Sequence, residues 1–286
     1  MPELPEVETI RRQLKKAILN KKITKVEVLS KKQFPQNPKL VVGKIIIAVE
    51  RRAKLLIIKL THQKNLIIHL KLSGQLIWQS NPPAGGQKIK LKRVIPTVGE
   101  FLPSKSTRVI LTIGRGKLFF NEMRKFGWIK LLTNVQLDKE LQKYGIEPFR
   151  KDFDQKSFAK ALTNTRRPIK TVLLDQEKIA GIGNIYANES LYLSKIHPAM
   201  PANTLNAKQV NGLRENIIKV LKLGLKYGGA SDEYYIHPDT TRGTYQNHFS
   251  VYGKSGESCR KCRSIIKRIS LGGRGTYFCP GCQKAE

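Results

Sequence analysis

The first residues of the chain, Met1-Pro2-Glu3, combine a nucleophile with a proton carrier. Cytosolic processing commonly removes a methionine that precedes a small residue, and Pro2 would then carry a free secondary amine. An α-amino group has a pKa of about 7.7–8.0, against about 10.4 for lysine, so more of this amine is neutral and nucleophilic at pH 7. Attack on a sugar C1′ would give an iminium, which acidifies the adjacent sugar protons and permits elimination of the phosphates, with Glu3 shuttling protons. The same letters also describe a well-capped helix start, and this segment alone favours that interpretation.

All four cysteines lie within residues 259–286, in the pattern Cys259-x2-Cys262-x16-Cys279-x2-Cys282. Two such pairs can place four thiolates tetrahedrally around one zinc ion, at about 2.3 Å each. Four thiolates leave no open coordination position, so the spacing predicts a structural zinc and disfavours free thiols or a redox pair. The intervening residues predict a β-hairpin with Gly272-Gly273 at or near its turn. Cysteines confined to one metal site suit a reducing compartment.

A glycine-rich motif, IAGIGNIY, spans residues 179–186. Gly181 and Gly183 permit tight turns, and a helix is expected to begin at or just after Asn184. A helix N-terminus with exposed amides suits a phosphate group. Together with the preceding LLDQ run, the motif indicates a DNA-binding helix–turn–helix class, and a joint with only a packing role is the alternative.

The segment NEMRKFG at residues 121–127 follows a predicted strand. An exposed Phe126 on a loop would make sense as a wedge between base pairs, while Arg124 replaces lost hydrogen bonds. The alternative is a hairpin with Phe126 in the core. Taken alone, the segment favours that alternative.

The charge balance points to a polyanionic partner. Lys and Arg number 53 against 21 Asp and Glu, a formal net charge of +32. Nucleic acid is the commonest partner for such an excess. No apolar run approaches the ~18 residues of a membrane span, and the acidic N-terminus lacks an apolar signal core. We therefore expect a cytoplasmic, nucleoid-associated protein that does not bind membranes.

The element pattern predicts a β-rich half followed by a helical half. Residues 4–19 read as a helix, with Pro5 and Glu6 in its first turn. Residues 79–106, rich in Pro, Gly and Lys, are expected to form a long loop that adds DNA contacts or is simply mobile. The expected strands are Ile23–Leu29, Val41–Val49, Leu55–Leu60, Leu66–Leu72, Val109–Ile113, Leu118–Asn121 and Trp128–Leu132. The expected helices are Val135–Lys143, Asp154–Leu162, Pro168–Leu174, Asn184–Leu193 and Ala207–Leu223.

Together these segments resemble formamidopyrimidine-DNA glycosylases, bacterial enzymes for oxidised purines. The resemblance covers nearly the whole chain, in the family's order. It rests on PELPEVET (2–9), RRAKLL (51–56), HLKLSGQ (69–75), MRKFGW (123–128), LLDQ (173–176), GIGNIYANESL (181–191), HP (197–198), TYQNHFSVYGKSG (244–256) and the cysteine-bearing tail. The related endonuclease VIII branch shares the fold but usually has a different tripeptide after proline, so Glu3-Leu4-Pro5 points to the oxidised-purine branch.

The resemblance implies an α+β multidomain protein. Its expected parts are an N-terminal catalytic β-sandwich with flanking helices (2–132), a linker (133–150), a helical helix–two-turn–helix domain with a lesion-capping loop (151–247), and a four-cysteine zinc-finger β-hairpin (248–286). The implied activity is excision of oxidised purines such as 8-oxoguanine and formamidopyrimidines from damaged double-stranded DNA, followed by β,δ-elimination. The implied protein holds one structural zinc ion and needs no nucleotide cofactor. We expect it to be a monomer.

The resemblance also assigns roles by position. Pro2 is the implied Schiff-base nucleophile, Glu3 the general acid/base and Glu6 a supporting buried acid. Lys54 and Arg274 are implied to bind phosphate and to donate protons for β- and δ-elimination respectively. Residues implied to contact DNA are His69, Leu72, Arg124, Phe126, Arg166 and Asn184.

Three departures from the family pattern bear on these roles. Leu72 stands where the family usually has methionine, and a residue of similar volume should still fill the void left by a flipped base. The 79–106 excursion is longer than usual and very basic. Residues 228–243 differ from the usual stretch that can close over the everted base. An oxidised-pyrimidine glycosylase on the same scaffold and a non-catalytic zinc nucleic-acid-binding protein remain the alternatives.

Overall fold

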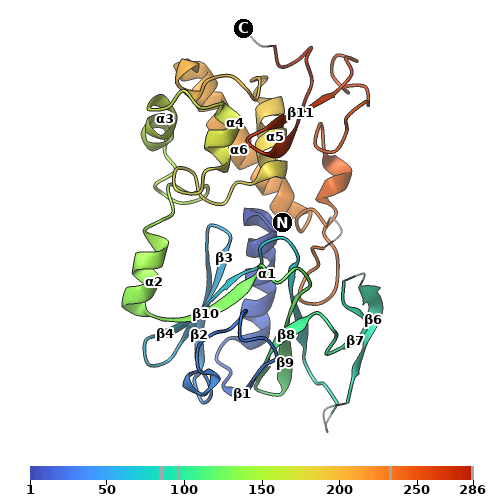
Figure 1. Cartoon of the computed structure of the whole chain (residues 1–286). Coiled ribbons are helices and arrows are strands. Elements are labelled where there is room, and N and C mark those ends of the chain that lie inside the picture. The colour runs from blue at the N-terminus through green and yellow to red at the C-terminus, as the bar shows by residue number, and fades with distance from the viewer. Residues whose placement is uncertain (84–86, 96, 232–233, 285–286) are drawn as a thin grey trace. The chain divides into compact units, whose positions relative to one another are not determined.

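The computed structural model describes residues 1–286 except 84–86, 96, 232–233 and 285–286 (Figure 1). The chain divides into two compact units: unit 1 contains residues 1–141 and 227–246, and unit 2 contains 142–226 and 247–286. The domain bounds expected from the sequence place residues 227–246 with the helices of the second half. The structure packs this segment with unit 1 instead, because Ala230 and Tyr235 hydrogen-bond to Glu6 in the first helix.

Unit 1 is built on two four-stranded antiparallel sheets (Figure 1). The first, called the β5 sheet, has the order β1 (Ile23–Val28), β8 (Thr107–Ile113), β9 (Gly116–Glu122) and β5 (Gly74–Gln79). The second, called the β4 sheet, has the order β10 (Trp128–Thr133), β4 (Lys64–His69), β3 (Leu55–Leu60) and β2 (Ile46–Arg52). The unit also contains α1 (Leu4–Ile18), η1 (Pro38–Leu40), the hairpin β6 (Ile89–Ile95) and β7 (Gly99–Leu102), and α2 (Asn134–Leu141).

One hydrophobic core joins α1 to both sheets. It takes alternate residues from each strand, because successive side chains of a strand point to opposite faces. The core includes Leu56 and Ile58 of β3, Leu66 and Ile68 of β4, Leu118 and Phe120 of β9, and Val7, Ile10, Leu14 and Ile18 of α1. The predicted β-sandwich is therefore confirmed.

The start of α1 is held by charge as well as by apolar packing. Glu8 accepts hydrogen bonds from Arg11 and Arg12 and forms a salt bridge at 3.4 Å to Arg51 of β2. Burial opposes ionisation of Glu8, but the bonds from Arg11 and Arg12 outweigh it and lower its pKa to about 2. Because Arg51 lies near the end of β2, this cluster fixes the first turns of α1 beside the end of that strand.

Part of the excursion at 79–106 is a hairpin, and the expectation of a long loop is wrong for the residues of its two strands, Ile89–Ile95 and Gly99–Leu102. Ile89, Leu91 and Ile95 are buried, whereas Lys90 and Lys92 between them are exposed. This alternation is the pattern of a half-buried strand, which the Pro, Gly and Lys content obscured. The buried side packs on Ile77, Ile110 and Phe119 of the β5 sheet, opposite the main core.

The two segments that depart from the family pattern contact each other. Ile236 belongs to the same apolar cluster as the β6–β7 hairpin. The side-chain amide of Gln75 donates to Thr97 Oγ1, at the hairpin turn, and to the Tyr234 carbonyl, at 2.8 and 2.6 Å. The Trp78 N–H donates to the Pro238 carbonyl at 2.8 Å. The β6–β7 hairpin and strand β5 thus support the 234–238 segment.

Other strand boundaries also differ from expectation. The strand expected at Val41–Val49 runs over Ile46–Arg52, after a 3-10 turn at Pro38–Leu40. The strand expected to end at Leu72 ends at His69, because Lys71 adopts a left-handed conformation (φ 52°) in the turn that follows. Strand β5 was not expected. The remaining strands and helices lie within a few residues of their predicted places.

Unit 2 consists of helices and a small hairpin. Its helices are α3 (Gln155–Thr163), α4 (Ile169–Leu174), α5 (Asn184–Leu193) and α6 (Ala207–Lys226), followed by β11 (Lys267–Leu271) and β12 (Arg274–Phe278). Helices α5 and α6 pack closely at Gly224, where a Cβ would lie 2.4 Å from the Tyr186 hydroxyl oxygen. None of the helices in the described part of the chain has the length and apolar character needed to cross a membrane.

A core truncation in β6 tests whether the hairpin is packed. Leu91→Ala is expected to lower the free energy of unfolding by about 2–3 kcal/mol, since it removes a buried side chain. Lys92→Ala, one position along on the exposed side, is the matched control and should change it by less than about 0.5 kcal/mol. Urea unfolding measures both. Equal, small effects would mean that the segment is a loose loop in solution.

Candidate functional site

One end of the sandwich in unit 1 gathers several of the predicted site residues. Lys54 lies in the turn between β2 and β3, and the strand register pairs the next residue, Leu55, with His69 at the end of β4. His69 also pairs with Trp128 at the start of β10, so the 123–127 loop that precedes Trp128 lies at this end too. The turn that carries Leu72 follows His69 directly.

The N-terminus reaches the same end. The salt bridge from Glu8 to Arg51 places the first turns of α1 beside the end of β2, next to the turn that holds Lys54. Pro2 and Glu3, which precede α1, are both buried. Met1 is exposed and still blocks the Pro2 nitrogen in this unprocessed chain.

Glu6 fixes the conformation of the chain at Glu3. One carboxylate oxygen of Glu6 accepts the Glu3 N–H and the other accepts the Ala230 N–H, each at 2.8 Å. The Tyr235 hydroxyl donates to the Glu6 carbonyl at 3.2 Å. Burial, and then the negative charge of Glu6, raise the pKa of Tyr235, so this hydroxyl stays a donor.

Gly229 is required beside this carboxylate. Its φ of +85° is one that residues with a side chain rarely adopt, and a Cβ there would lie 2.8 Å from Glu6 Oε1. The Gly-Gly pair at 228–229 therefore lets the chain pass close enough for the Ala230 N–H to reach Glu6.

His69 is held as a neutral donor. Burial, then the positive charges of Lys71 and Lys54, lower the pKa of His69 to about 3. Its Nδ1 accepts the Lys71 N–H at 3.0 Å, so the proton of the neutral ring resides on Nε2. The ring can thus donate one hydrogen bond from Nε2 at neutral pH. Because the charge of Lys54 contributes to the lowered pKa of His69, Lys54 and His69 lie near each other.

Phe126 is exposed, with 54% of its surface accessible, so it is not part of the core. The Arg124 guanidinium stacks on it, with 5.4 Å between the Arg124 Cζ and the ring centroid. The core alternative favoured by this segment alone is therefore wrong. Phe126 and Arg124 thus form an exposed pair, and their entry into DNA stays a prediction.

Unit 2 positions its predicted residues around the start of α5. Gln176 of the LLDQ run brackets the glycine loop, donating to the Leu174 and Ile182 carbonyls and accepting the Gly181 N–H, each at 2.9 Å. Gly183 caps α5, whose first residue is Asn184, as predicted. Arg166 is exposed in the segment between α3 and α4.

The finger hairpin docks on α4 and α5 through polar bonds. The Asn184 amide donates to the Gly275 carbonyl at 3.0 Å, and Asn188 Oδ1 accepts the Tyr277 N–H at 2.8 Å. The buried Lys170 ammonium donates to the Gly275 carbonyl at 3.0 Å and to Thr276 Oγ1 at 2.7 Å. These bonds leave Arg274 exposed at the start of β12. Asn184 thus contacts the strand that carries Arg274.

The predicted turn of this hairpin is confirmed. Gly272 and Gly273 both have positive φ, 58° and 69°, which is the pattern of a two-residue type I′ hairpin turn. The register pairs Leu271 with Arg274 across it.

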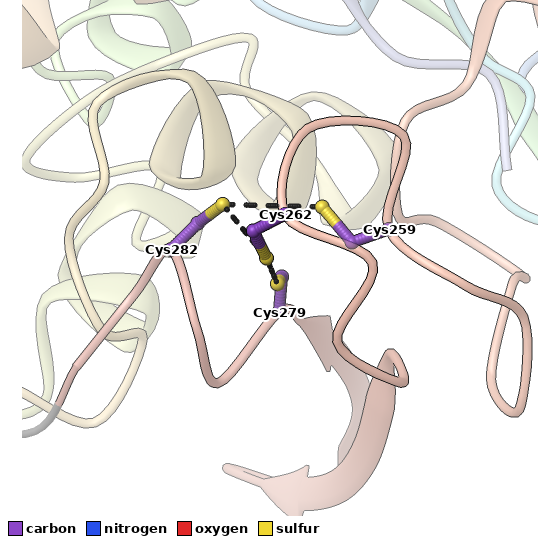
Figure 2. A group of neighbouring side chains, drawn as sticks. All are labelled: Cys259, Cys262, Cys279 and Cys282. Atoms are coloured by element: carbon purple, nitrogen blue, oxygen red, sulfur yellow. Dashed lines mark hydrogen bonds between the residues drawn. The ribbon is translucent and has the colours of Figure 1, made fainter.

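The four cysteines converge on one point, and Figure 2 shows their sulfurs turned toward one another. All four Sγ atoms lie within 4.8 Å of one another, with 3.3 Å between Cys262 and Cys279 and 3.9 Å between Cys259 and Cys282. Thiolates at about 2.3 Å from a tetrahedral metal would stand about 3.8 Å apart, whereas a disulfide needs about 2.05 Å. The site therefore fits one structural zinc ion. The Tyr192 hydroxyl of α5, 3.3 Å from Cys259 Sγ, is placed to donate to that thiolate.

Three contacts that hold these elements were not singled out from the sequence. Glu122 at the end of β9 accepts N–H groups of the Phe126 loop, and Gln33 donates to the Lys125 carbonyl. Glu189 in α5 accepts the N–H groups of Ser250, Val251 and Tyr252, which lead into the finger. For Glu122 and Glu189 the available signal was a charged residue within a largely apolar strand or helix, whereas Gln33 lies in a turn and carries no such signal.

Comparison with known proteins gives three family models along the chain. The N-terminal domain model of formamidopyrimidine-DNA glycosylase matches residues 1–129, its H2TH domain model matches 144–235, and the zinc finger found in this enzyme and in isoleucyl-tRNA synthetase matches 256–285. A formamidopyrimidine-DNA glycosylase of Chloroflexus aurantiacus is 39% identical over 99% of this chain and 98% of the relative. The chain belongs to the formamidopyrimidine-DNA glycosylase family.

Other relatives and solved structures agree. The formamidopyrimidine-DNA glycosylase of Ligilactobacillus salivarius is 38% identical over 99% of both chains. A Lactococcus lactis formamidopyrimidine-DNA glycosylase mutant in complex with DNA containing Fapy-dG is 36% identical, with a TM-score of 0.87 over 99% of this chain and 100% of that chain. The α+β class, the helical H2TH region and the zinc finger of this formamidopyrimidine-DNA glycosylase family member are thereby confirmed.

Removal of one zinc ligand tests the role of the metal. Cys279→Ser is expected to lose bound zinc and to weaken binding of duplex DNA, because the finger that presents Arg274 loses its metal cross-link. Ser255→Ala, at an exposed position of the same segment, is the control and should keep one zinc per chain. Elemental analysis and a DNA-binding titration measure the two effects. Full affinity without bound zinc would contradict the structural role.

Proposed function

We propose that this family member excises oxidised purines from duplex DNA with the Pro2 amine as nucleophile, and then cleaves the backbone. The observation that carries the proposal is the fixed N-terminus. Pro2 and Glu3 are buried at the sandwich end that also holds Lys54 and His69, and both oxygens of Glu6 are bonded to backbone N–H groups.

The reaction begins when removal of Met1 frees the Pro2 nitrogen. The neutral amine attacks C1′ of the damaged nucleotide, the C1′–base bond breaks, and the departing base takes a proton. Opening of the sugar ring gives an iminium at C1′, which makes the C2′ protons acidic. Loss of such a proton expels the 3′ phosphate, and a second elimination expels the 5′ phosphate, which leaves a one-nucleotide gap.

The neighbouring residues have distinct parts in this proposal. Glu3, adjacent to the amine, transfers protons to and from the base and the sugar. Glu6 positions Glu3, since its carboxylate already accepts two N–H groups. Lys54 binds phosphate and donates a proton in the β-elimination, and its positive charge disfavours protonation of the nearby amine.

Residues of both units contact the DNA. In unit 1, His69 donates from Nε2 to a phosphate oxygen, while Leu72, Arg124 and Phe126 fill the space that the flipped base leaves. In unit 2, Arg166 and the start of α5 at Asn184 contact backbone phosphates, and Arg274 grips the phosphates at the flipped nucleotide and donates a proton in the δ-elimination. The zinc ion holds the finger and takes no chemical part.

The remaining features follow from this function. The protein acts as a monomer in the cytoplasm, in association with the nucleoid. The catalytic part corresponds to residues 2–132 together with the 227–246 segment that packs on them, the linker to 133–150, the DNA-binding helices to 151–226 and the finger to 248–286. The high positive charge predicts binding to phosphates that weakens strongly with salt.

Replacement of the nucleophile tests the chemistry. Pro2→Gly is expected to lower the yield of borohydride-trapped adduct with abasic duplex by on the order of 100-fold, while duplex binding is kept. Pro83→Gly, at an exposed position of unit 1, is the matched control. Failure of the unmodified protein to form any adduct with damaged or abasic duplexes would instead favour a non-catalytic DNA-binding protein.

The substrate class is tested by cleavage of two duplexes side by side. A duplex with 8-oxoguanine is expected to be cut faster than one with thymine glycol, because Glu3-Leu4-Pro5 matches the oxidised-purine branch. The measurement is the ratio of kcat/KM for the two lesions. A ratio in favour of thymine glycol would assign the chain the activity of an endonuclease VIII.

A further inference from the structure

Residues 123–127 form an exposed loop between β9 and β10 whose contacts fix it firmly. The loop carries the stacked pair of Arg124 and Phe126, and Lys125 between them adopts a left-handed conformation, with φ of 58°. More than half of the surface of Phe126 is exposed, 54% of it. The position of these side chains therefore depends on how the loop backbone is held.

The inner support of the loop is the carboxylate of Glu122. This residue is fully buried at the end of β9. One of its oxygens accepts the Arg124 N–H at 3.0 Å and the Ser73 hydroxyl, and the other accepts the Gly127 N–H at 2.8 Å. A Cβ on Gly127 would lie 2.5 Å from the same oxygen, so glycine is needed for this approach.

The same carboxylate connects two loops. Ser73 belongs to the turn after β4 that also carries Leu72, and its hydroxyl lies 3.2 Å from the Arg124 nitrogen. Glu122 thus ties the Leu72 turn to the Arg124–Phe126 loop, two segments that are about 50 residues apart in the sequence.

A second support holds the loop from the other side. The buried Gln33 donates from Nε2 to the Lys125 carbonyl at 3.0 Å, and its backbone carbonyl accepts the Ile129 N–H at 2.7 Å. The loop is therefore bonded at both ends and in its middle.

We propose that Glu122 is a positioning residue that sets Leu72, Arg124 and Phe126 in advance for entry into duplex DNA; this rests on the proposed function. Insertion of a loop into a base stack orders its side chains and backbone, and a loop that is already ordered loses less entropy on binding. The role requires a carboxylate, because two oxygens must accept three donors. A glutamine amide would offer one oxygen and turn N–H groups toward the remaining donors.

The test compares Glu122→Gln with the unmodified protein on three DNAs. Its Kd for a duplex with a tetrahydrofuran abasic analogue is expected to rise roughly tenfold or more. Its Kd for undamaged duplex and its rate of cleavage of a single-stranded abasic oligonucleotide should not change, because neither involves filling a void inside a duplex. The matched control is Glu100→Gln, an exposed glutamate of the same unit, which should leave all three values unchanged.

A double-mutant cycle distinguishes positioning from a general structural effect. If Glu122 acts through these side chains, Glu122→Gln adds little to the loss already caused by replacing Leu72, Arg124 and Phe126 together with alanine. Additive losses, or an equal loss of affinity for damaged and undamaged duplexes, would overturn the proposal. Unchanged affinity of Glu122→Gln for the abasic duplex would also overturn it.

Two further measurements keep the test decisive. Should thermal unfolding show that Glu122→Gln does not fold, Ser73→Ala removes one donor and leaves the carboxylate in place. Ser73→Ala is expected to show a smaller loss of affinity that is also selective for the abasic duplex. If Ser73→Ala shows no such loss, the proposal is contradicted. Borohydride trapping of the unmodified protein on single-stranded abasic DNA tests the proposed chemistry separately. If no adduct forms there, the proposed chemistry is wrong, whatever the role of Glu122.

Discussion

The structure of unit 1 depends on one buried carboxylate. Glu6 joins the Glu3 N–H to the N–H of Ala230, a residue 224 positions away, and so ties the chain start to the segment after α6. A buried charge is stable only when its hydrogen-bonding capacity is used. The two segments therefore cannot separate without exposing the Glu6 carboxylate to water or leaving it without hydrogen-bond donors. Chain ends normally fray, so this constraint supplies the fixed geometry that the attack we propose for Pro2 on a sugar carbon requires.

The same solution recurs wherever a functional segment must be held. Glu122 fixes the loop of Arg124 and Phe126, and Glu189 binds three consecutive N–H groups that lead into the finger. Lys170 holds the strand that carries Arg274. In each case a buried charge on a helix or strand holds backbone or side-chain polar groups of a neighbouring segment. The loops that we propose to contact DNA are exposed and polar, so they are fixed by charge-assisted hydrogen bonds and not by apolar packing.

Local signals predicted much of this molecule. The start of α1, the start of α5 at Asn184, the Gly272-Gly273 turn and the four-cysteine site each depend on neighbouring residues or on fixed spacing. The features that the sequence did not predict depend on partners that are distant along the chain. The β6–β7 hairpin is stabilised by the outer face of the β5 sheet, and its support of Tyr234 through Gln75 has no local sequence signature. The exposure of Phe126 was misjudged from its own segment, because the supports of that loop come from Glu122 and Gln33.

The covalent bond to DNA is proposed to form at the ring nitrogen of Pro2. The most direct measurement is peptide mass mapping of the borohydride-reduced complex between the unmodified protein and an abasic duplex. We expect one adduct, on an N-terminal peptide that begins with Pro2 and lacks Met1. An adduct on a lysine such as Lys54, or an active enzyme that retains Met1, would contradict it.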